Sequence, residues 1–207
     1  MSGLLITFEG IDFSGKSSQL HLLGDYLAGR GHEVLYLREP GGTAISESIR
    51  DILLDNANSS MAAEAELLLY AAARAQVVAE RILPFIRAGG IVLCDRYADS
   101  TTAYQGYGRG LDLAFVESLN NFATRNRKPD MTVLIDIQPE LAIKRRKTGD
   151  TLDRMENQTL EFHQKVRSGY LTIAQSQPER CYVIAGTQDI GSIHKQIVTY
   201  IKSKFHI

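Results

Sequence analysis

Cysteine, net charge and long apolar runs are all scarce in this chain of 207 residues. The two cysteines, Cys94 and Cys181, each lie within an apolar run and form no C-x-x-C pattern, so neither a disulfide framework nor a zinc site is indicated. The formal net charge of -1 argues against a general nucleic-acid or membrane-surface binder, because such proteins carry a strong basic excess. No apolar run approaches the ~20 residues that cross a bilayer, and no signal peptide precedes the first apolar segment. We therefore expect a cytoplasmic protein with neither nucleic acid nor membrane among its partners.

The chain instead offers a regular alternation of short apolar segments and longer helical stretches. Such alternation is typical of a parallel sheet with helices on both faces. No repeat, low-complexity tract or linker marks a domain boundary. The sequence therefore predicts a single α/β domain over residues 1–207, with three α/β/α layers and a five-stranded parallel sheet. The predicted strands are Leu4–Phe8, Val34–Leu37, Ile91–Cys94, Thr132–Ile135 and Cys181–Ile184, and the clearest helices are Ala62–Arg87, Ala114–Ala123 and Asn157–Gln175.

A phosphate-binding motif directly follows the first predicted strand. Residues Gly10–Ser17 fit the pattern G-x-x-x-x-G-K-[ST], in which glycines let backbone N–H groups turn toward phosphate oxygens. A helix that starts near Gly15 adds the positive end of its dipole. Lys16 can reach the β and γ phosphates of a nucleoside triphosphate, and Ser17 can offer its hydroxyl to Mg²⁺. The residues predicted to bind the triphosphate are Gly10, Ile11, Asp12, Phe13, Ser14, Gly15, Lys16, Ser17 and Ser18.

Charged residues stand at the ends of the second and third predicted strands, where ligands bind in an open α/β sheet. Arg38 precedes an irregular Gly- and Pro-rich turn and can hold an anion, or it can pair with a surface acid. Asp95 stands where P-loop enzymes keep the acid of the magnesium shell, so Ser17 and Asp95 are the predicted metal residues. Arg96 suits bidentate contact with a phosphate, and a buried Asp95–Arg96 ion pair is the alternative.

Two further segments carry candidate functional side chains. Tyr70 and Arg74, at positions i and i+4 of a helix, share one face and could stack on a base and bond its edge. The alternative is a tyrosine at the edge of the core beside a solvated arginine. The basic run Lys144–Lys147 is either a solvated face or the start of a lid that excludes water and supplies an arginine. Such a lid would span about residues 144–155.

Five motifs occur together in a specific order over residue 4 to about residue 170. They are Phe8–Gly10 before the phosphate loop, Arg38–Gly42, Leu68–Arg74, Asp95–Gly106 and Leu152–Glu156. In this combination the chain resembles the thymidylate kinases of the P-loop nucleoside monophosphate kinase superfamily. The resemblance implies transfer of the γ-phosphoryl group from ATP, with Mg²⁺, to thymidine 5′-monophosphate (dTMP), which yields dTDP and ADP.

The resemblance also implies roles for individual residues of the acceptor site. Asp12 would lie near the acceptor's sugar and phosphate, and Arg38 and Arg96 would hold that phosphate. Two arginines can neutralise a roughly dianionic phosphate and leave its oxygen free to attack in line. Tyr70 would stack on the pyrimidine, where many relatives have Phe, and its added hydroxyl needs a partner. The full set predicted to bind the acceptor is Asp12, Arg38, Tyr70, Arg74, Arg96, Ser100, Thr101, Tyr104 and Gln105.

Four of these residues would surround the base and sugar. Arg74 would bond the base carbonyl, Gln105 with Thr101 would read the other edge of the ring, and Tyr104 would close off the sugar's 2′ position. One position departs from some relatives, because Phe13 stands where they carry a catalytic arginine. Like the bacterial type, this chain should draw its cation from the lid: Arg145, Arg146 or Lys147, with Arg154 alongside. The predicted catalytic residues are Lys16, Asp12, Arg38, Arg96, Arg145, Arg146 and Arg154.

Three alternatives to this function stay open at the level of sequence. The chain could phosphorylate another pyrimidine monophosphate, because a pocket discriminates weakly against the loss of one methyl group. It could bind nucleotides without catalysis. It could also be a GTPase-like switch, since Asn126–Asp130 superficially resembles a guanine-reading motif, although an arginine intervenes and the run precedes its strand. The resemblance implies a homodimer, and the apolar faces of Ala62–Arg87 and Ala114–Ala123 suit a dimer or a monomer's core equally well.

Overall fold

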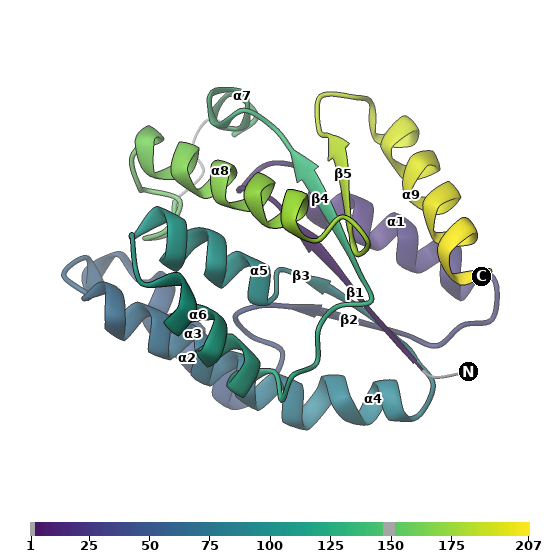
Figure 1. Cartoon of the computed structure of the whole chain (residues 1–207), viewed down its shortest axis with the longest axis horizontal. Coiled ribbons are helices and arrows are strands. Elements are labelled where there is room, and N and C mark those ends of the chain that lie inside the picture. The colour runs from purple at the N-terminus through teal and green to yellow at the C-terminus, as the bar shows by residue number, and fades with distance from the viewer. Residues whose placement is uncertain (1–2, 147–151) are drawn as a thin grey trace.

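The fold is built around a twisted sheet of five parallel strands (Figure 1). The computed structural model describes residues 3–146 and 152–207. The strand order is β2-β3-β1-β4-β5, so the first strand of the chain lies in the middle of the sheet. This arrangement confirms the predicted α/β fold. The strands are β1 (Leu4–Glu9), β2 (Val34–Arg38), β3 (Ile91–Asp95), β4 (Met131–Asp136) and β5 (Cys181–Ala185).

Helices cover both faces of the sheet because alternate residues of each strand point to opposite sides. Ile6 and Phe8 of β1 pack into the core under α1 and α9, whereas Leu5 packs with Val77 and Val78 on the other face. The helices α3, α4 and α8 lie on that second face (Figure 1). The helices are α1 (Lys16–Ala28), α2 (Ala44–Leu54), α3 (Ala63–Val77), α4 (Leu83–Arg87), α5 (Ala98–Thr101), α6 (Leu113–Ala123), α7 (Pro139–Lys144), α8 (Leu160–Ser176) and α9 (Ile190–Phe205).

The long helices follow the predictions with two adjustments. The helix predicted over 62–87 is α3 and α4 joined by a π-helical segment, Val78–Ile82. The helix predicted from Asn157 starts three residues later as α8, because Thr159 is its N-cap and accepts a hydrogen bond from the N–H of Phe162. A second π-helical segment, Thr102–Gly108, directly follows α5. Such segments are rare and occur frequently at functional sites.

The carboxyl ends of the central strands meet at one edge of the sheet. In the parallel register, Arg38 of β2 is paired with Asp95 of β3, and Phe8 of β1 is paired with the same Asp95. Residues that follow β1, β2 and β3 therefore meet, as the sequence predicted.

Both cysteines are buried free thiols. Within the described ranges, no helix combines the length and apolar character needed to cross a bilayer.

Candidate active site

The phosphate loop leaves β1 and ends where α1 begins. Gly10 has a φ of 134° and Gly15 a φ of 102°, conformations that residues with a side chain rarely adopt. A Cβ atom on Gly10 would lie 2.5 Å from the carbonyl oxygen of Ile135, so the loop requires glycine there for space as well. The backbone amides at the start of α1, near Gly15, lie at the positive end of the helix dipole. The loop therefore has the geometry that an anion-binding turn needs.

Lys16 lies folded back over this loop. Its ammonium donates a hydrogen bond of 2.8 Å to the backbone carbonyl of Ile11, and its side chain is buried. Burial and the nearby charge of Arg96 lower the pKa of Lys16, whereas Asp95 and Asp12 oppose that shift. A phosphate placed in the loop would add further negative charge and favour the protonated lysine.

Ser17 and Asp95 bring two oxygen ligands together at the predicted metal position. The Ser17 hydroxyl donates to Oδ2 of Asp95 across 2.6 Å. One hydroxyl and one carboxylate suit Mg²⁺, which keeps several waters and takes few protein ligands. In the described part of the chain no group of three or more His, Cys, Asp and Glu side chains is placed to hold a metal ion. The two residues therefore fit a magnesium ion that also binds phosphate oxygens.

Arg96 joins the end of β3 to the phosphate loop. Its Nη2 donates to Oδ1 of Asp12 across 2.5 Å, and Tyr104 donates to the other oxygen of Asp12 across 3.0 Å. Although burial opposes it, the charges of Arg96 and Lys16 hold the pKa of Asp12 well below its usual range. The alternative of an Asp95–Arg96 pair does not occur, because Arg96 pairs with Asp12 and Asp95 accepts from Ser17.

Arg38 pairs with a surface acid, which is one of the two alternatives that its position in the sequence left open. It forms an ion pair of 2.9 Å with Glu47 on α2, and its side chain also lines the central cavity. A second arginine, Arg50 on the same helix, donates to the carbonyl of Pro40 across 3.0 Å, as Arg38 also does. The sequence analysis missed Arg50. Its spacing of three residues from Glu47 is the one signal that could have placed it on this face of α2.

The residues predicted to contact the base lie together on α3, α5 and the π-helical segment Thr102–Gly108. These base-reading residues are Tyr70, Arg74, Thr101 and Gln105. Arg74 is almost completely buried, so the alternative of a solvated arginine is wrong. Its guanidinium donates to four groups among the described residues, which uses four of its five N–H donors and leaves one for a ligand. These groups are Oε2 of Glu39 at 2.7 Å, Oγ1 of Thr101 at 2.8 Å, Oδ1 of Asn120 at 2.9 Å and the carbonyl of Tyr97 at 3.0 Å.

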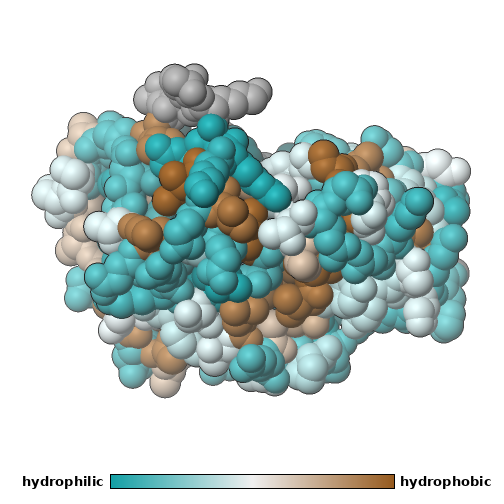
Figure 2. Space-filling view, turned by 90° about the horizontal axis from the view of Figure 1, so that it is seen from above, coloured by the Kyte–Doolittle hydropathy of each residue, from teal (hydrophilic) through white to brown (hydrophobic). Residues whose placement is uncertain are grey.

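A cavity of about 480 Å³ connects the phosphate loop with the base-reading residues. Asp12 and Arg96 lie on its wall between the two ends. Seen from above, the molecule is largely hydrophilic, with hydrophobic patches in the middle of the view and smaller ones at its sides (Figure 2). Predicted site residues that line the cavity are Asp12, Phe13, Gly15, Lys16, Ser17, Ser18, Arg38, Tyr70, Arg74, Asp95, Arg96, Ser100, Thr101, Tyr104, Gln105 and Arg145. Gly10, Ile11, Ser14, Arg146 and Arg154 do not line it.

The lid cations have different surroundings. Arg145 donates to the carbonyls of Ser14, at 3.3 Å, and Gly186, at 2.6 Å, so it lies beside the phosphate loop. Arg146 lines a much smaller neighbouring cavity. Arg154 is buried and donates to Oε2 of Glu66 across 2.6 Å. Lys147, like the rest of residues 147–151, lies outside the described residues.

Several residues of the cavity wall were not predicted. Glu39 is buried beneath Arg74 and forms its ion pair, and Leu54 lies at the end of α2. Glu39 lies within the motif Arg38–Gly42. A carboxylate beside Pro and Gly in this motif was the signal that could have indicated a partner for a buried cation. The remaining unpredicted residues of the wall are Pro40, Arg50, Asp153, Met155 and Glu156.

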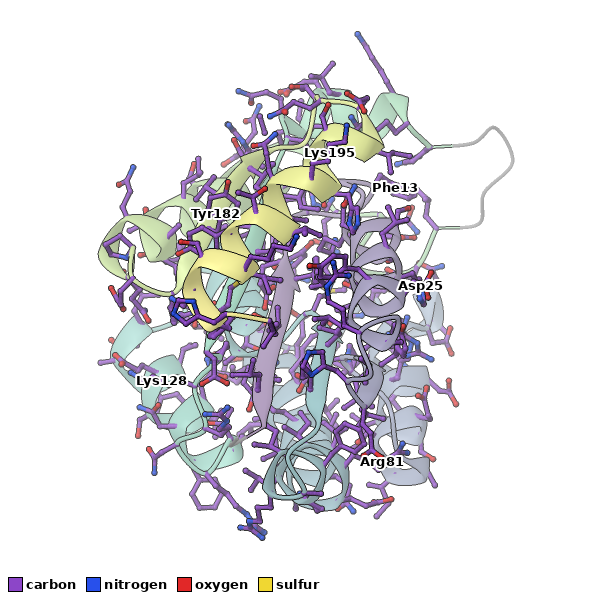
Figure 3. The ribbon with its side chains drawn as sticks, turned by 90° about the vertical axis from the view of Figure 1, so that its right-hand side faces the viewer. Phe13, Asp25, Arg81, Lys128, Tyr182 and Lys195 are labelled. Atoms are coloured by element: carbon purple, nitrogen blue, oxygen red, sulfur yellow. The ribbon has the colours of Figure 1, made fainter. Side chains whose placement is uncertain are left out.

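The position of Phe13 separates this site from the sequence that resembles a guanine-reading motif. Phe13 lies at the end of the molecule toward which β1 points, whereas Lys128 lies toward the opposite end (Figure 3). The segment Asn126–Asp130, which contains Lys128, directly precedes β4, as the sequence analysis expected. The segment Asn126–Asp130 therefore lies far from the phosphate loop, at the amino end of its strand, and cannot read a base bound there.

Known proteins of similar sequence and structure share one description. The sequence model of the family described as thymidylate kinase matches residues 8–197. A thymidylate kinase of Thermoanaerobacter sp. (strain X514) is 47% identical over 202 residues, which cover 98% of each chain. One of Pelobacter propionicus is 46% identical over 205 residues, with 96% of this chain and 94% of that one covered. The crystal structure of the Ehrlichia chaffeensis thymidylate kinase superposes with a TM-score of 0.80 at 35% identity, covering 98% of this chain and 99% of that one.

Proposed function

This chain belongs to the thymidylate kinase family and transfers the γ-phosphoryl group of ATP to dTMP, and we propose that the cavity described above is the site of that transfer. The supporting observation is the continuity of the cavity from the phosphate loop to the base-reading residues. A phosphoryl donor bound at one end and an acceptor at the other would face each other between Lys16 and Arg96.

At the acceptor end, Arg96 and Arg38 bind the phosphate of dTMP. Asp12 keeps Arg96 ionised and oriented, because its carboxylate accepts a hydrogen bond of 2.5 Å from the Arg96 guanidinium. Tyr70 stacks on the pyrimidine, and the remaining N–H of Arg74 bonds a base carbonyl. Tyr104 and Ser100, both hydrogen-bonded to the guanidinium of Arg96, close the wall beside the sugar.

At the donor end, the backbone N–H groups of the phosphate loop hold the β and γ phosphates. Lys16 leaves the carbonyl of Ile11 for the phosphates, because a dianionic group attracts an ammonium more strongly than a neutral carbonyl does. Ser17 and Asp95 hold Mg²⁺ or a water bound to it. When bound, this ion neutralises charge on the β and γ phosphates. Arg145, beside the loop, is the lid cation whose geometry best supports a role at the transferring group.

The transfer requires little proton chemistry of the protein. The acceptor phosphate is already a nucleophile at neutral pH, so no side chain has to act as a general base. Positioning of the two phosphates and stabilisation of the developing charge by Lys16, Arg38, Arg96 and the lid arginines supply the rate enhancement. Arg146 and Arg154 remain candidate members of this set.

We also propose that the protein is a cytoplasmic homodimer. Its two buried free thiols, Cys94 and Cys181, suit a reducing compartment in which ATP is available. Support for the dimer comes from α2, α3 and α6, which pack side by side and carry exposed apolar side chains. Exposed apolar side chains that gather on neighbouring helices are typical of subunit interfaces. The exposed apolar residues on these helices are Ile45, Ile52, Leu68, Leu113, Phe115 and Phe122.

A coupled assay of ADP release tests the proposed site and its acceptor. The panel contains Mg²⁺-ATP with the monophosphates of thymidine, deoxyuridine, uridine, deoxycytidine and adenosine. We expect turnover with dTMP, with deoxyuridine monophosphate (dUMP) a weaker second because one methyl group contributes only about 1–3 kcal/mol. Chelation should abolish turnover and added Mg²⁺ should restore it. Preference for another base would overturn the base-reading assignments, and turnover without any divalent ion would overturn the magnesium site.

A further inference from the structure

Glu66 is a buried carboxylate that the proposed mechanism does not use. It lies on α3, only 1% exposed, one helical turn before Tyr70. Its Oε1 accepts hydrogen bonds from Nε2 of Gln105 at 2.8 Å and from Nε of Arg109 at 3.1 Å. Its Oε2 accepts from Nη2 of Arg109 at 2.9 Å and from Nη1 of Arg154 at 2.6 Å. Four donors from three side chains therefore converge on one carboxylate.

These neighbours keep Glu66 ionised despite its burial. Burial alone would raise the pKa of the carboxyl group, but the hydrogen bonds from Arg109 and Gln105 and the charge of Arg109 lower it below its usual value. An ionised carboxylate has no proton to donate, so it can only accept hydrogen bonds. Whatever polar group touches it must present an N–H or O–H.

This restriction determines how the amide of Gln105 lies. A glutamine side chain ends in an NH₂ group and a carbonyl oxygen, and exchange of the two would bring the carbonyl against the carboxylate. The NH₂ group must therefore face Glu66. Gln105 itself lines the cavity. The carbonyl oxygen of its side-chain amide has no hydrogen-bond partner within residues 3–146 and 152–207. The carbonyl is thus the end of the amide that remains available to a ligand.

We propose that Glu66 is a positioning residue for base selection: by binding the NH₂ group of Gln105, it makes the pocket present a hydrogen-bond acceptor to the edge of the base. This inference rests on the proposed function and on the role that the resemblance implies for Gln105, which is to read that edge. Thymine and uracil carry an N–H at ring position 3, which an acceptor can bind. Cytosine carries a lone pair there, and two acceptors facing each other in a buried site repel and lose their bonds to water.

Binding measurements with two nucleotides isolate this effect. dUMP and deoxycytidine monophosphate (dCMP) lack the methyl group equally and differ only at ring positions 3 and 4, so the ratio of their Kd values reports the edge of the base. The change in this ratio between the wild type and a variant at Glu66 reports the part that depends on Gln105. We expect the wild-type protein to bind dUMP at least about tenfold more tightly than dCMP in calorimetry. In Glu66→Gln, the new carbonyl should take the place of Oε2 and keep the Nη donors of Arg109 and Arg154, at the loss of the Nε hydrogen bond of Arg109. The new NH₂ group should then donate to Gln105, which turns that amide over. The ratio should then fall about tenfold or more.

The control variant is Glu64→Gln, an exposed glutamate on the same helix, which should leave both Kd values unchanged. Looser packing alone would weaken both nucleotides alike and leave the ratio intact. An unchanged ratio in a folded Glu66→Gln protein would therefore overturn the inference. Failure of the wild type to bind dTMP, dUMP or dCMP would overturn the proposed function and this inference together.

A second variant keeps the test decisive if Glu66→Gln does not fold. Gln105→Met removes the amide and leaves the ion pairs of Glu66 with Arg109 and Arg154 in place. If the carbonyl faces the base, this variant should lose affinity for dUMP about tenfold and keep most of its affinity for dCMP. A selective loss of dCMP binding, or no change in either Kd, would show that Gln105 does not present its carbonyl to the base.

Discussion

The guanidinium of Arg96 and the carboxylate of Asp12 approach within 2.5 Å and join the end of β3 to the phosphate loop. Arg96 adopts a left-handed backbone conformation, with a φ of 71°, which directs its side chain across the carboxyl end of β1 to the loop. Strained conformations of this kind occur mainly at functional sites. The pair thus places one cation between the two ends of the cavity.

Replacement of this cation should affect catalysis more than folding. In Arg96→Met we expect kcat/KM for dTMP to fall at least about a hundredfold, because a phosphate loses a charge-assisted bidentate partner. Arg30→Met, on an exposed arginine next to the end of α1, is the matched control and should retain full activity. Steady-state kinetics of both variants give the answer. Near-normal kcat/KM in Arg96→Met would remove Arg96 from the phosphate site.

Lys16→Ala should be folded and nearly inactive. Among the described residues the side chain of this lysine donates one hydrogen bond, to the carbonyl of Ile11, whereas its charge is needed at the transferring phosphoryl group. We expect turnover to fall at least about a hundredfold with little change in the thermal midpoint. Lys195→Ala, an exposed lysine on α9 (Figure 3), serves as control. Turnover within a few fold of the wild type would contradict the role of Lys16.

Arg74→Met should reduce both stability and acceptor binding. The substitution leaves Glu39 buried without its cation, which costs about 3–5 kcal/mol of unfolding free energy when a buried ion pair is broken. The double variant Arg74→Met with Glu39→Gln should recover part of this loss, because the uncompensated charge is gone. Urea unfolding measures both effects. The KM for dTMP should rise in each variant, and an unchanged KM would exclude contact between Arg74 and the base.

Glu9 should make stability depend on pH. Burial and the charge of Asp99 raise its pKa to about 8, from 4.5 in an unfolded chain. The protonated form is therefore favoured in the folded state, so this contribution to stability is fully present below pH 4.5 and is lost as the pH rises to about 8. In Glu9→Gln that loss is absent, because glutamine does not titrate.

Urea unfolding of the wild type and of Glu9→Gln between pH 5 and pH 8 tests this linkage. The difference in unfolding free energy should shift in favour of the variant by up to about 1.4 kcal/mol per pH unit. Taking the difference cancels groups that titrate alike in both proteins. Parallel stability curves would show that Glu9 is already ionised in the folded protein.

Phe122→Asp should convert the proposed dimer to a monomer. Phe122 is 81% exposed on α6, a helix that packs against α3, and a charge there would be buried in the proposed interface. Ile190→Asp, at a residue 60% exposed at the start of α9, changes a different surface and should not alter the mass. Light scattering after size exclusion measures both. A monomeric wild type would refute the dimer itself.

Much of the fold was predictable because its signals are local. Each strand is a short apolar run, each long helix has apolar residues at helical spacing, and their alternation allows few arrangements other than a parallel sheet. The errors were at helix boundaries. The start of α8 at Leu160 depends on the Thr159 cap, and the π-helical segment at Val78–Ile82 has no simple pattern in the sequence.

The sequence predicted most residues of the site, but it predicted few of the contacts between them. Most predicted residues line one cavity, since residues that follow parallel strands meet at one edge of the sheet. Glu39, Arg50 and Leu54 were missed because nothing in the order of residues shows which carboxylate, cation or apolar side chain will lie beneath a neighbour. The surroundings of Arg154 were unexpected for the same reason, and its catalytic role stays a prediction.

The sequence by itself determined the phosphate loop, the succession of strands and helices along the chain and the motifs that indicate the family, because each of these signals depends on residues close together in the chain. Only the tertiary structure decided which polar side chains pair within the site: Asp12 with Arg96, Glu39 with Arg74 and Glu66 with Gln105. These pairs join residues 84, 35 and 39 positions apart. Which donor meets which acceptor over such separations is set by the packing of whole helices against the sheet, and that packing is a property of the folded chain alone.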